Sequence, residues 1–458
     1  MDLSRFEGRK IALLGFGIEN ISVAKFLLKN GIDFQILDKT PAGKLTREGQ
    51  LLIKEKKLKI KTGTDYLANI SDYNFVIRSP GIPYLTPEIQ TAKEAGAEIT
   101  SSTKLFLELT KCQVIGVTGT KGKGTTASLI YEILKNGYSS LGKIYLAGNI
   151  GIASFDIIEE VKSEDLVVLE LSSFQIQDLD CSPYVTVVVN LTDDHLDYHQ
   201  TIEEYQATKQ AVLKFQNEND FAVLNKDYRE CYKLKEFGKA KKYFFSSKEK
   251  TDGAYVNRNG DVILTVSGEE KICSQKEVQL IGRHNLENIA AAAIVGKIFN
   301  VAIADIHRVV TEFKGLPHCL EFVREINGVK FYNDSFSTNP TPTMAAIDSF
   351  SEPITIILGG SKKGADFTKL ADKIKSSTVK NVILIGVEGP RIKKSLEKAG
   401  VSANFIDGDK DIETIVHQAV EVAKPNSIIL FSPACASFDM FKNYKGRGEK
   451  FKQAVKDL

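Results

Sequence analysis

The feature that most constrains the fold of this chain is an alternation of short apolar runs with helical patterns along its whole length. In the first third, strand-like apolar runs lie at 11–17, 34–38 and 74–82, and helical patterns such as ISVAKFLLKNG separate them. Strands that alternate with helices favour a parallel sheet covered by helices. We therefore expect an α/β fold.

The alternation restarts near residue 102 and again near residue 315, where FKGLPH separates a helical run from a new strand. At roughly 150 residues per domain, 458 residues suit three domains that each bury their own core. We place these domains at 1–102, 103–315 and 316–458. One segment, 253–266, alternates around Asn259 and Gly260, which both tolerate positive φ, so it predicts a hairpin.

Composition excludes several classes of protein. The 60 Lys and Arg residues nearly balance the 58 Asp and Glu residues, which argues against a nucleic-acid binder. No run of ~18 apolar residues is present, so we expect no membrane span. The six cysteines show no spacing suited to zinc and are expected to be reduced, as in a cytoplasmic protein.

The strongest local signal is GVTGTKGKGTT at 116–126, where an apolar strand enters a Gly-rich turn and leaves as a helix. This is the layout of a phosphate-binding loop, in which Lys123 supplies a charge to the β- and γ-phosphates. The strict Walker spacing is not met, since Gly124 follows the lysine, and a turn without a ligand is the alternative. The residues expected to hold ATP are Gly119, Thr120, Lys121, Gly122, Lys123, Gly124, Thr125 and Thr126, with the Mg²⁺-binding hydroxyl on Thr125 or Thr126.

Acidic residues end two of the apolar runs in the second domain. Glu170 ends one run, and Asp193, Asp194 and His195 follow another. Ligands of open α/β sheets bind at the carboxyl ends of strands, and Mg²⁺ prefers oxygen ligands. The alternative for Asp193, Asp194 and Asp197 is a solvated loop acid or a helix N-cap, and a lone histidine in such a loop is often structural.

The first domain carries GFGIEN at 15–20, which resembles a dinucleotide-binding fingerprint cut short after its second glycine. Asp38 lies 21 positions after Gly17, at the end of the second strand. This pattern favours a Rossmann-like domain that binds a nucleotide, although the missing third glycine argues against NAD. A tight turn followed by an exposed acid is an equally weighted alternative.

Eight motifs occur along the chain in an order that resembles the Mur ligases, the enzymes that build the peptide stem of the bacterial cell-wall precursor. The C-terminal stretch SPACASFDMFKNY is most similar to glutamate-adding members of this family, and the resemblance covers the whole chain. The motifs are TGTKGKGTT, GNIG (148–151), ELSSFQ (170–175), NLTDDH (190–195), HNLEN (284–288), LPH (316–318), NDS (333–335) and SPACASFDMFKNYKGRG (432–448).

The resemblance implies a Rossmann-like N-terminal domain for a UDP-sugar, a central P-loop ATPase domain with a mostly parallel sheet, and a Rossmann-like C-terminal domain for the incoming amino acid. In the implied reaction, ATP phosphorylates the alanine carboxylate of UDP-N-acetylmuramoyl-L-alanine. The amine of D-glutamate then attacks the acyl phosphate, and a tetrahedral intermediate collapses to amide and phosphate. A monomer in the cytoplasm is implied, with ATP, these two substrates and two Mg²⁺ ions as its small-molecule partners.

Roles for individual residues are implied by motif matches. Lys123, His195 and Lys209 match catalytic positions, and Lys209 in EYQATKQAV matches a lysine that is carbamylated to bind a second Mg²⁺; one exposed helix lysine among many is the alternative. The metal ligands would be Thr125, Glu170, His195 and Lys209. Asn285, Asn288 and Asp334 would contact the adenosine part of ATP, with helix capping as their alternative. The residues that contact the UDP-sugar would be Gly15, Phe16, Gly17, Asp38, Ser79 and Asn149. The residues that bind the substrate glutamate would be Thr338, Lys363, Ser437 and Tyr444.

Three departures from the family pattern change the cations near the reacting groups. Cys319 stands where LPHR has arginine, Phe336 where DSKATN has lysine, and Lys121 is a gained cation. We hypothesise that Lys121, Arg283 or Arg324 takes over part of the phosphate charge. L-glutamate addition, glutamate addition to a folate, and a weakened ligase that acts as a nucleotide-binding regulatory subunit remain alternatives.

Overall fold

A computed structural model of the chain describes residues 3–191, 210–362 and 364–458. Contacts divide the chain into two compact units. The first contains the residues up to Glu277 and Leu286–Thr311, and the second contains Val278–Asn285 and Glu312–Leu458. Among the described residues, no helix combines the length and the apolar character needed to cross a bilayer.

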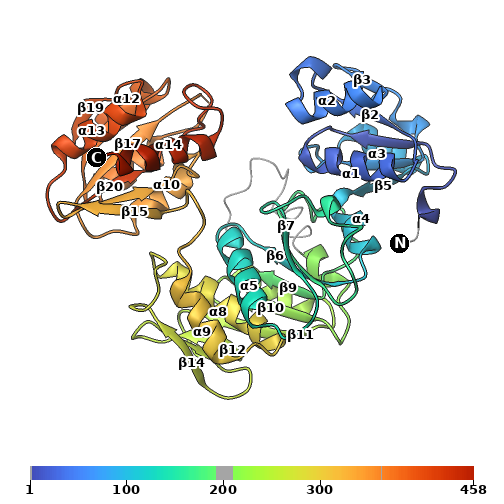
Figure 1. Ribbon diagram of the computed structural model, residues 1–458, viewed down its shortest axis with the longest axis horizontal. Helices are drawn as coiled ribbons and strands as arrows, with labels where there is room; N and C mark the ends of the chain where they lie inside the picture. Colours follow the sequence, from blue (N-terminus) through green and yellow to red (C-terminus); the bar gives the residue numbers. More distant parts are fainter. Residues whose placement is uncertain (1–2, 192–209, 363) are drawn as a thin grey trace. The chain divides into compact units, whose positions relative to one another are not determined.

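The first unit begins with a five-stranded sheet in the order β3-β2-β1-β4-β5, in which every neighbouring pair is parallel (Figure 1). The strand order reverses between β1 and β4, which is where open α/β sheets bind ligands. The predicted Rossmann-like sheet is therefore present. Its strands are β1 (Ile11–Leu14), β2 (Phe34–Asp38), β3 (Ile60–Thr62), β4 (Phe75–Arg78) and β5 (Glu98–Ser101), with helices α1 (Ile18–Lys29), α2 (Arg47–Lys56) and α3 (Pro87–Glu94).

A nine-stranded sheet follows in the same unit, in the order β14-β13-β12-β11-β10-β9-β6-β8-β7. The pairs from β7 to β12 are parallel, and the pairs β12–β13 and β13–β14 are antiparallel. The strands are β6 (Gln113–Thr118), β7 (Ile144–Gly148), β8 (Leu166–Glu170), β9 (Val185–Val188), β10 (Phe221–Asn225), β11 (Lys241–Ser246), β12 (Gly253–Val256), β13 (Asp261–Leu264) and β14 (Glu270–Ser274). The helices are α4 (Ser102–Leu109), α5 (Lys123–Gly137), α7 (Arg229–Lys233), α8 (His284–Ile298), whose first two residues belong to the second unit, and α9 (Ile303–Glu312).

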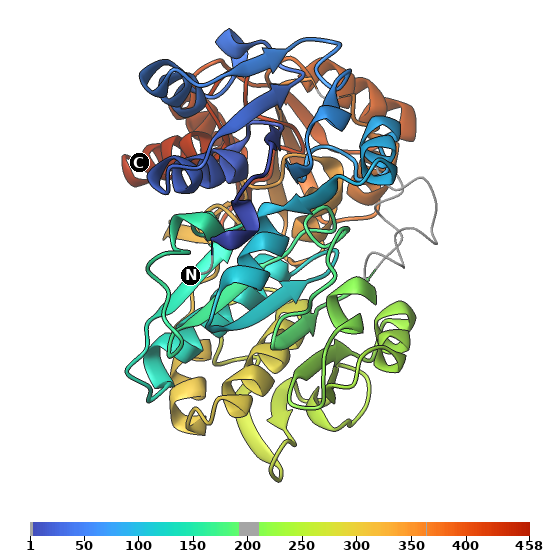
Figure 2. The same cartoon turned by 90° about the vertical axis from the view of Figure 1, so that its right-hand side faces the viewer.

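The predicted hairpin is confirmed at β12 and β13, and Figure 2 shows it at the yellow-green end of the central sheet. Its turn is built on Asn257, whose carbonyl accepts from the Gly260 amide at 3.1 Å and whose side chain accepts from the Asn259 and Asp261 amides. Gly260 adopts the positive φ, +82°, that the turn requires. The turn therefore spans four residues, rather than the Asn259-Gly260 pair alone.

The second unit holds a six-stranded sheet in the order β15-β16-β20-β17-β18-β19, which is parallel except for the edge pair β15–β16. Asn443 caps the last helix by accepting from the Gly446 amide at 2.9 Å, and Asn339 caps α10 in front of Pro340. The strands are β15 (Glu321–Ile326), β16 (Val329–Asn333), β17 (Ile354–Gly359), β18 (Val379–Ile385), β19 (Asn404–Asp407) and β20 (Ser427–Phe431). The helices are α10 (Pro340–Ile347), α11 (Thr368–Lys375), α12 (Gly389–Ala399), α13 (Ile412–Val422) and α14 (Tyr444–Lys456).

The three predicted sheets are thus present, and each carries candidate site residues just beyond the carboxyl ends of its strands. Buried aliphatic strands such as β1, β8 and β17 form the cores, because both faces of a parallel sheet are covered. The domain boundaries near 102 and 315 stay predictions.

Candidate functional site

The predicted phosphate loop connects β6 to α5 and depends on two glycines. Gly119 has φ +151° and Gly122 has φ +80°, which L side chains rarely adopt. A Cβ atom on Gly122 would lie 2.6 Å from the Asn288 side-chain oxygen. The loop therefore packs its backbone closely against Asn288, and Gly122 forms the N-cap of α5.

Asn190 holds this loop from the strand next to it. Its side-chain oxygen accepts from the Thr120 and Lys121 amides at 3.1 and 2.8 Å, and its amide donates to the Lys121 carbonyl at 3.0 Å. These two loop N–H groups already donate to Asn190. The N–H groups at the N-terminus of α5 therefore remain to bind an anion. Asn190 was not predicted from sequence, although its place just after β9 is the kind of position where ligand-site residues occur.

Lys123 is the first residue of α5 and is largely enclosed. Its ammonium group donates to the Thr120 carbonyl at 3.1 Å and, among the described residues, forms no ion pair within 4.0 Å. Burial lowers the pKa of Lys123, and the negative charge of Glu170 partly opposes this effect. The loop thus holds a largely enclosed cation, and the part of the chain that the structure describes supplies no ion-pair partner for it.

Glu170 ends β8, the strand next to β6, and is 4% exposed. Burial raises the pKa of Glu170, and a hydrogen bond from the Asn149 side chain, at 3.1 Å, together with Lys123 partly offsets this rise. The Asn149 amide also donates to the Glu170 carbonyl at 3.0 Å. Asn149 is therefore hydrogen-bonded to Glu170. Its contact with the UDP-sugar stays a prediction.

These residues fit a Mg²⁺–nucleotide. The Thr126 hydroxyl is fully buried and donates to Asn288 at 3.2 Å, whereas Thr125 is only partly buried, so Thr125 is the better placed hydroxyl for a metal. Glu170 adds a carboxylate, and both groups are oxygen ligands suited to Mg²⁺. Of the residues predicted near this site, Asp193, Asp194, His195, Asp197 and Lys209 lie outside the described residues. Within the described residues, no group of three or more His, Cys, Asp or Glu side chains could hold a metal.

The two predicted adenosine asparagines are held differently. Asn288 is 3% exposed and accepts from Thr126, so it belongs to the back of the phosphate loop. Asn285 donates to the Ile281 carbonyl at 2.7 Å, which closes the turn before α8. This donation is not the helix cap of the alternative, in which the side-chain oxygen accepts from an amide of the first turn, and a contact of either residue with adenine stays a prediction.

The predicted UDP-sugar residues of the first sheet are brought together at the β1–β4 switch point. Gly15 has φ +79°, and a Cβ atom there would lie 2.9 Å from the Ser79 Cβ atom. The Asp38 carboxylate accepts from the Phe16 and Thr40 amides, both at 2.6 Å. Gly17 is the N-cap of α1. The Asp38 side chain thus fixes the β1–α1 turn; the tight turn of the alternative is present, but its acid is buried, at 8% exposure, and not exposed.

In the second unit, Asp334 follows β16 and is 3% exposed. It accepts from the Ser432 hydroxyl at 2.6 Å, from the Ser337 hydroxyl, and from the Leu320 amide at 3.1 Å. Burial raises the pKa of Asp334 to about 6 despite these donors. Its carboxylate is thus already surrounded by donors from its own unit.

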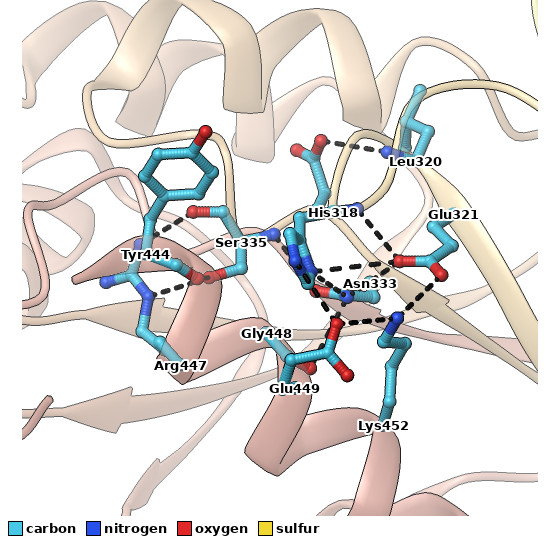
Figure 3. Close-up of polar contacts among 11 residues, drawn as sticks. His318, Leu320, Glu321, Asn333, Ser335, Tyr444, Arg447, Gly448, Glu449 and Lys452 are labelled. Carbon is cyan, nitrogen blue, oxygen red and sulfur yellow. Dashed lines mark hydrogen bonds and ion pairs between the residues drawn. The ribbon is translucent and has the colours of Figure 1, made fainter. Parts of the chain in front are cut away.

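Arg447 lies close by on α14 and was not predicted from sequence, although KGRG places it inside a motif. Arg447 is 1% exposed, and its guanidinium donates to the Ser335 hydroxyl at 3.0 Å and to the Ser335 carbonyl at 2.9 Å (Figure 3). It also donates to the Cys435 carbonyl at 3.0 Å. Burial lowers its pKa to about 10. Arg447 therefore ties α14 to the segment after β16 and to the segment after β20.

His318, in the LPH motif, packs against the same helix. A Cβ atom on Gly448 would lie 2.3 Å from His318 Nδ1, so only glycine fits there. Asn333 donates to Nδ1 at 2.9 Å, and Nε2 lies 3.4 Å from a Glu449 carboxylate oxygen (Figure 3). Burial lowers the pKa of His318, which agrees with a neutral ring that carries its proton on Nε2. Lys452 completes this cluster by pairing with Glu321 at 3.0 Å and with Glu449 at 2.9 Å.

Thr338, one of the residues predicted to bind the substrate glutamate, lines a cavity of about 260 Å³. Ser437 is buried just beyond β20, Tyr444 begins α14, and Lys363 lies outside the described residues. The structure therefore does not bring all four predicted residues to this cavity. The other lining residues are Asn339, Ser361, Ala365, Phe367, Glu388, Ala434 and Cys435.

Two of the three positions that depart from the family pattern, Cys319 and Phe336, carry no cation. Burial raises the pKa of Cys319 to about 12, so the thiol stays protonated, and Phe336 packs edge-on against Tyr444 with centroids 5.4 Å apart. Arg324 donates to the Val455 and Lys456 carbonyls at the end of α14, which occupies its guanidinium. Lys121 and Arg283 are exposed.

Comparison with known proteins adds the family. Three family models match successive parts of the chain: the Mur ligase MurD-like N-terminal domain at 9–101, the Mur ligase middle domain at 117–296, and the Mur ligase glutamate ligase domain at 319–435. Together they match most of the chain, in the order in which the three sheets occur.

Curated relatives match over nearly the full length. The UDP-N-acetylmuramoylalanine–D-glutamate ligases of Clostridium kluyveri and Clostridium novyi are each 38% identical to the chain, over 98% of it and 97% of each relative. Among solved structures, UDP-N-acetylmuramate-alanine ligase MurC from Thermotoga maritima superposes with a TM-score of 0.59 at 18% identity, covering 98% of this chain and 99% of that one. MurF ligase from the same organism, in complex with ADP, gives a TM-score of 0.55 at 19% identity, covering 100% of this chain and 97% of that one. With the family models and relatives agreeing over almost its whole length, the chain belongs to the Mur ligase family.

Proposed function

We propose that the chain is an ATP-dependent ligase that joins D-glutamate to UDP-N-acetylmuramoyl-L-alanine in peptidoglycan precursor synthesis. The observation that carries this proposal is the pair Lys123 and Glu170, a half-buried cation at the start of α5 and a buried carboxylate at the end of β8, which form no direct ion pair with each other. Burying such charges is costly unless a ligand completes their environment. The 38% identity with the clostridial D-glutamate ligases supports the choice of substrates.

The proposed reaction needs activation of a carboxylate. A carboxylate is a poor electrophile because its leaving group would be oxide, and phosphorylation by ATP replaces this group with phosphate. Two anions must meet for that step, so positive charge has to be concentrated where they approach. The glutamate amine then forms the amide bond as phosphate leaves.

In this account, Lys123 and the N-terminal amides of α5 bind the β- and γ-phosphates. Glu170 and Thr125 hold Mg²⁺, which neutralises phosphate charge when bound, together with His195 and a carbamylated Lys209 as further proposed ligands. The β1–β4 switch point, with Gly15, Asp38 and Ser79, binds the UDP-sugar. The remaining proposed contacts to the UDP-sugar come from Phe16, Gly17 and Asn149.

The second unit is proposed to bind the amino acid and the adenosine. Thr338 in its cavity, with Ser437, Tyr444 and Lys363, would hold glutamate, since a dicarboxylate needs a cation and hydroxyl donors. Asp334 and Asn285 are its proposed adenosine residues, and Asn288, which lies in the first unit, is a further one. We assign these roles to domains at 1–102, 103–315 and 316–458, in a monomeric cytoplasmic enzyme that uses two Mg²⁺ ions.

The decisive experiment offers the purified chain UDP-N-acetylmuramoyl-L-alanine, Mg²⁺ and ATP with D-glutamate or with L-glutamate, and follows phosphate release and product mass. We expect release with D-glutamate that exceeds release with L-glutamate by at least about tenfold. Release with L-glutamate alone would reassign the stereochemistry. No release with either would overturn the ligase function and favour the regulatory alternative suggested by Cys319 and Phe336.

A further inference from the structure

A buried charge cluster lies in the first unit, away from the phosphate loop. Arg78, the last residue of β4, is fully buried, and its guanidinium lies 3.3 Å from the Asp178 carboxylate, whose side chain is 1% exposed. Asp178 also accepts from the Ser101 hydroxyl at 3.2 Å. Neither charged residue belongs to a predicted site, although Arg78 directly precedes Ser79.

Arg78 makes contact with two chain segments at once. One terminal nitrogen donates to the Ile82 carbonyl at 2.6 Å and lies 3.4 Å from the Ser79 carbonyl, so it folds the 79–82 loop around itself. The other terminal nitrogen donates to the Phe174 carbonyl at 3.2 Å and pairs with Asp178. The guanidinium therefore joins the 79–82 loop to the 172–178 segment.

Each of these segments carries part of a proposed substrate site. Ser79, in the 79–82 loop, packs against Gly15 at the UDP-sugar switch point. The 172–178 segment begins two residues after the proposed metal ligand Glu170, which ends β8. The site for the UDP-sugar and the site for its activation are thus linked through one side chain.

Glu19 makes a second link of the same kind. It lies in the first turn of α1, two residues after Gly17, and its carboxylate accepts from the Ser102 hydroxyl and from the Gln175 amide, the latter at 2.7 Å. Gln175 in turn accepts from the Ser172 amide at 2.8 Å. The β1–α1 turn and the 79–82 loop are therefore both attached to the 172–178 segment.

A requirement for stability alone explains this cluster poorly. A buried ion pair adds little net stability, since desolvation offsets the attraction, and apolar side chains would fill the same space. An arginine instead orients the groups around it, because its rigid, planar guanidinium binds several acceptors at defined angles at once. Lysine, with a single point charge, cannot hold the same set of acceptors.

We propose that Arg78 is a positioning residue for the UDP-sugar: through Asp178 and the Phe174 carbonyl, it holds the 79–82 loop in register with the segment that follows Glu170. This inference rests on the proposed function, because it assumes that the switch point binds the UDP-sugar. The proposal predicts that loss of the Arg78 guanidinium weakens UDP-sugar binding and leaves ATP binding intact.

The test compares the full-length wild type with Arg78→Lys and Asp178→Asn. We expect the KM for UDP-N-acetylmuramoyl-L-alanine to rise about tenfold in Arg78→Lys, as expected for losing one charged hydrogen-bond set. The KM for ATP and kcat should stay within about twofold, because the phosphate loop is untouched. Asp178→Asn, which keeps the shape but removes the charge, should change the same KM in the same direction by less.

Arg5→Lys is the matched control. Arg5 also joins the two parts of the first unit, through Glu98 and Glu108, but makes no contact with the 79–82 loop. Calorimetric titration of UDP-N-acetylmuramoyl-L-alanine without ATP gives a readout independent of turnover, and thermal unfolding reports folding of each variant. A folded Arg78→Lys variant with wild-type affinity, or an equal rise in both KM values, would overturn the proposal. A wild type that neither binds nor turns over the UDP-sugar would instead overturn the proposed function on which it rests.

Discussion

The phosphate loop and the Asp334–Arg447 region both bury charged side chains, but they satisfy them very differently. Within residues 3–191, 210–362 and 364–458, the Lys123 ammonium donates one hydrogen bond, to a carbonyl, and the Glu170 carboxylate accepts one, from Asn149. Arg447 makes three hydrogen bonds to its own unit, and Asp334 accepts from two hydroxyls and an amide.

This difference separates a binding site from a scaffold. Buried charges are normally paired or fully hydrogen-bonded, so a charge left with few partners indicates a place that a ligand completes. Saturated charges such as Arg447 fix the geometry of the chain around them. We therefore expect substitutions in the phosphate loop to remove activity while sparing stability, and substitutions at Arg447 to do the reverse.

The largest effect is expected for Lys123→Met. Removing the loop cation should lower kcat/KM for ATP by about 10²–10³-fold, because charge stabilisation of the phosphates is lost in an enclosed site. The unfolding midpoint should stay the same or rise, since the variant no longer buries an ammonium group. Lys135→Met, an exposed site on the same helix, is the control and should change neither quantity. A variant with nearly full activity would refute the assignment of the loop.

Arg447→Met should have the opposite profile. Its three acceptors would be left without a donor, so the free energy of unfolding in urea should fall by about 3–4 kcal/mol. The exposed Lys450→Met on α14 serves as the control and should stay within about 0.5 kcal/mol of wild type. If Arg447→Met kept wild-type stability but lost activity, Arg447 would act in the substrate site and not as part of the scaffold.

A smaller effect concerns the pH dependence of the Asp334 region. The pKa of Asp334 is raised to about 6 by burial, so the folded state binds its proton more tightly than the unfolded chain does. The contribution of Asp334 to stability should therefore fall as pH rises from about 4 to about 6 and stay constant above this window. Relative to Asp334→Asn, which does not titrate, the wild type should lose about 2–3 kcal/mol across this range. The control Asp372→Asn, at an exposed carboxyl, should leave the slope of the wild type unchanged, and a wild-type slope in Asp334→Asn would contradict the assignment.

The smallest effect is expected for Lys121→Asn, which tests whether the phosphate loop compensates for the cations missing at Cys319 and Phe336. Lys121 is exposed and contributes charge through solvent, so acyl-phosphate formation measured by rapid quench should slow by about three- to tenfold. Lys111→Asn, before β6, is the control. An unchanged rate in Lys121→Asn would reject Lys121 as the substitute.

The sequence predicted the three sheets because strand–helix alternation and Gly-rich turns are local signals. The same locality placed Gly15 and Glu170 correctly at the ends of their strands and Gly122 in the turn that leads into α5. The hairpin between β12 and β13 was predicted, but its turn depends on side-chain hydrogen bonds of Asn257, which spacing alone does not show.

The residues that sequence reasoning missed act across long chain separations. Asn190 holds a loop some 70 positions earlier, Arg78 reaches Asp178, and Arg447 reaches Ser335. Each lies in or beside a recognisable motif, but its partner is set by the packing of strands that are distant in sequence. Arg324 is the opposite case. The sequence suggested it as a cation for the phosphates, but in the structure it donates to carbonyls at the end of α14.

The most direct measurement of the central claim is calorimetric binding of a non-hydrolysable ATP analogue with Mg²⁺ to the wild type, Lys123→Met and Arg447→Lys. If sparsely paired buried charges mark the nucleotide site, affinity should fall about 100-fold in Lys123→Met and stay near the wild-type value in a folded Arg447→Lys variant. Unchanged affinity in Lys123→Met, or an equal loss in both variants, would contradict the distinction between the two regions.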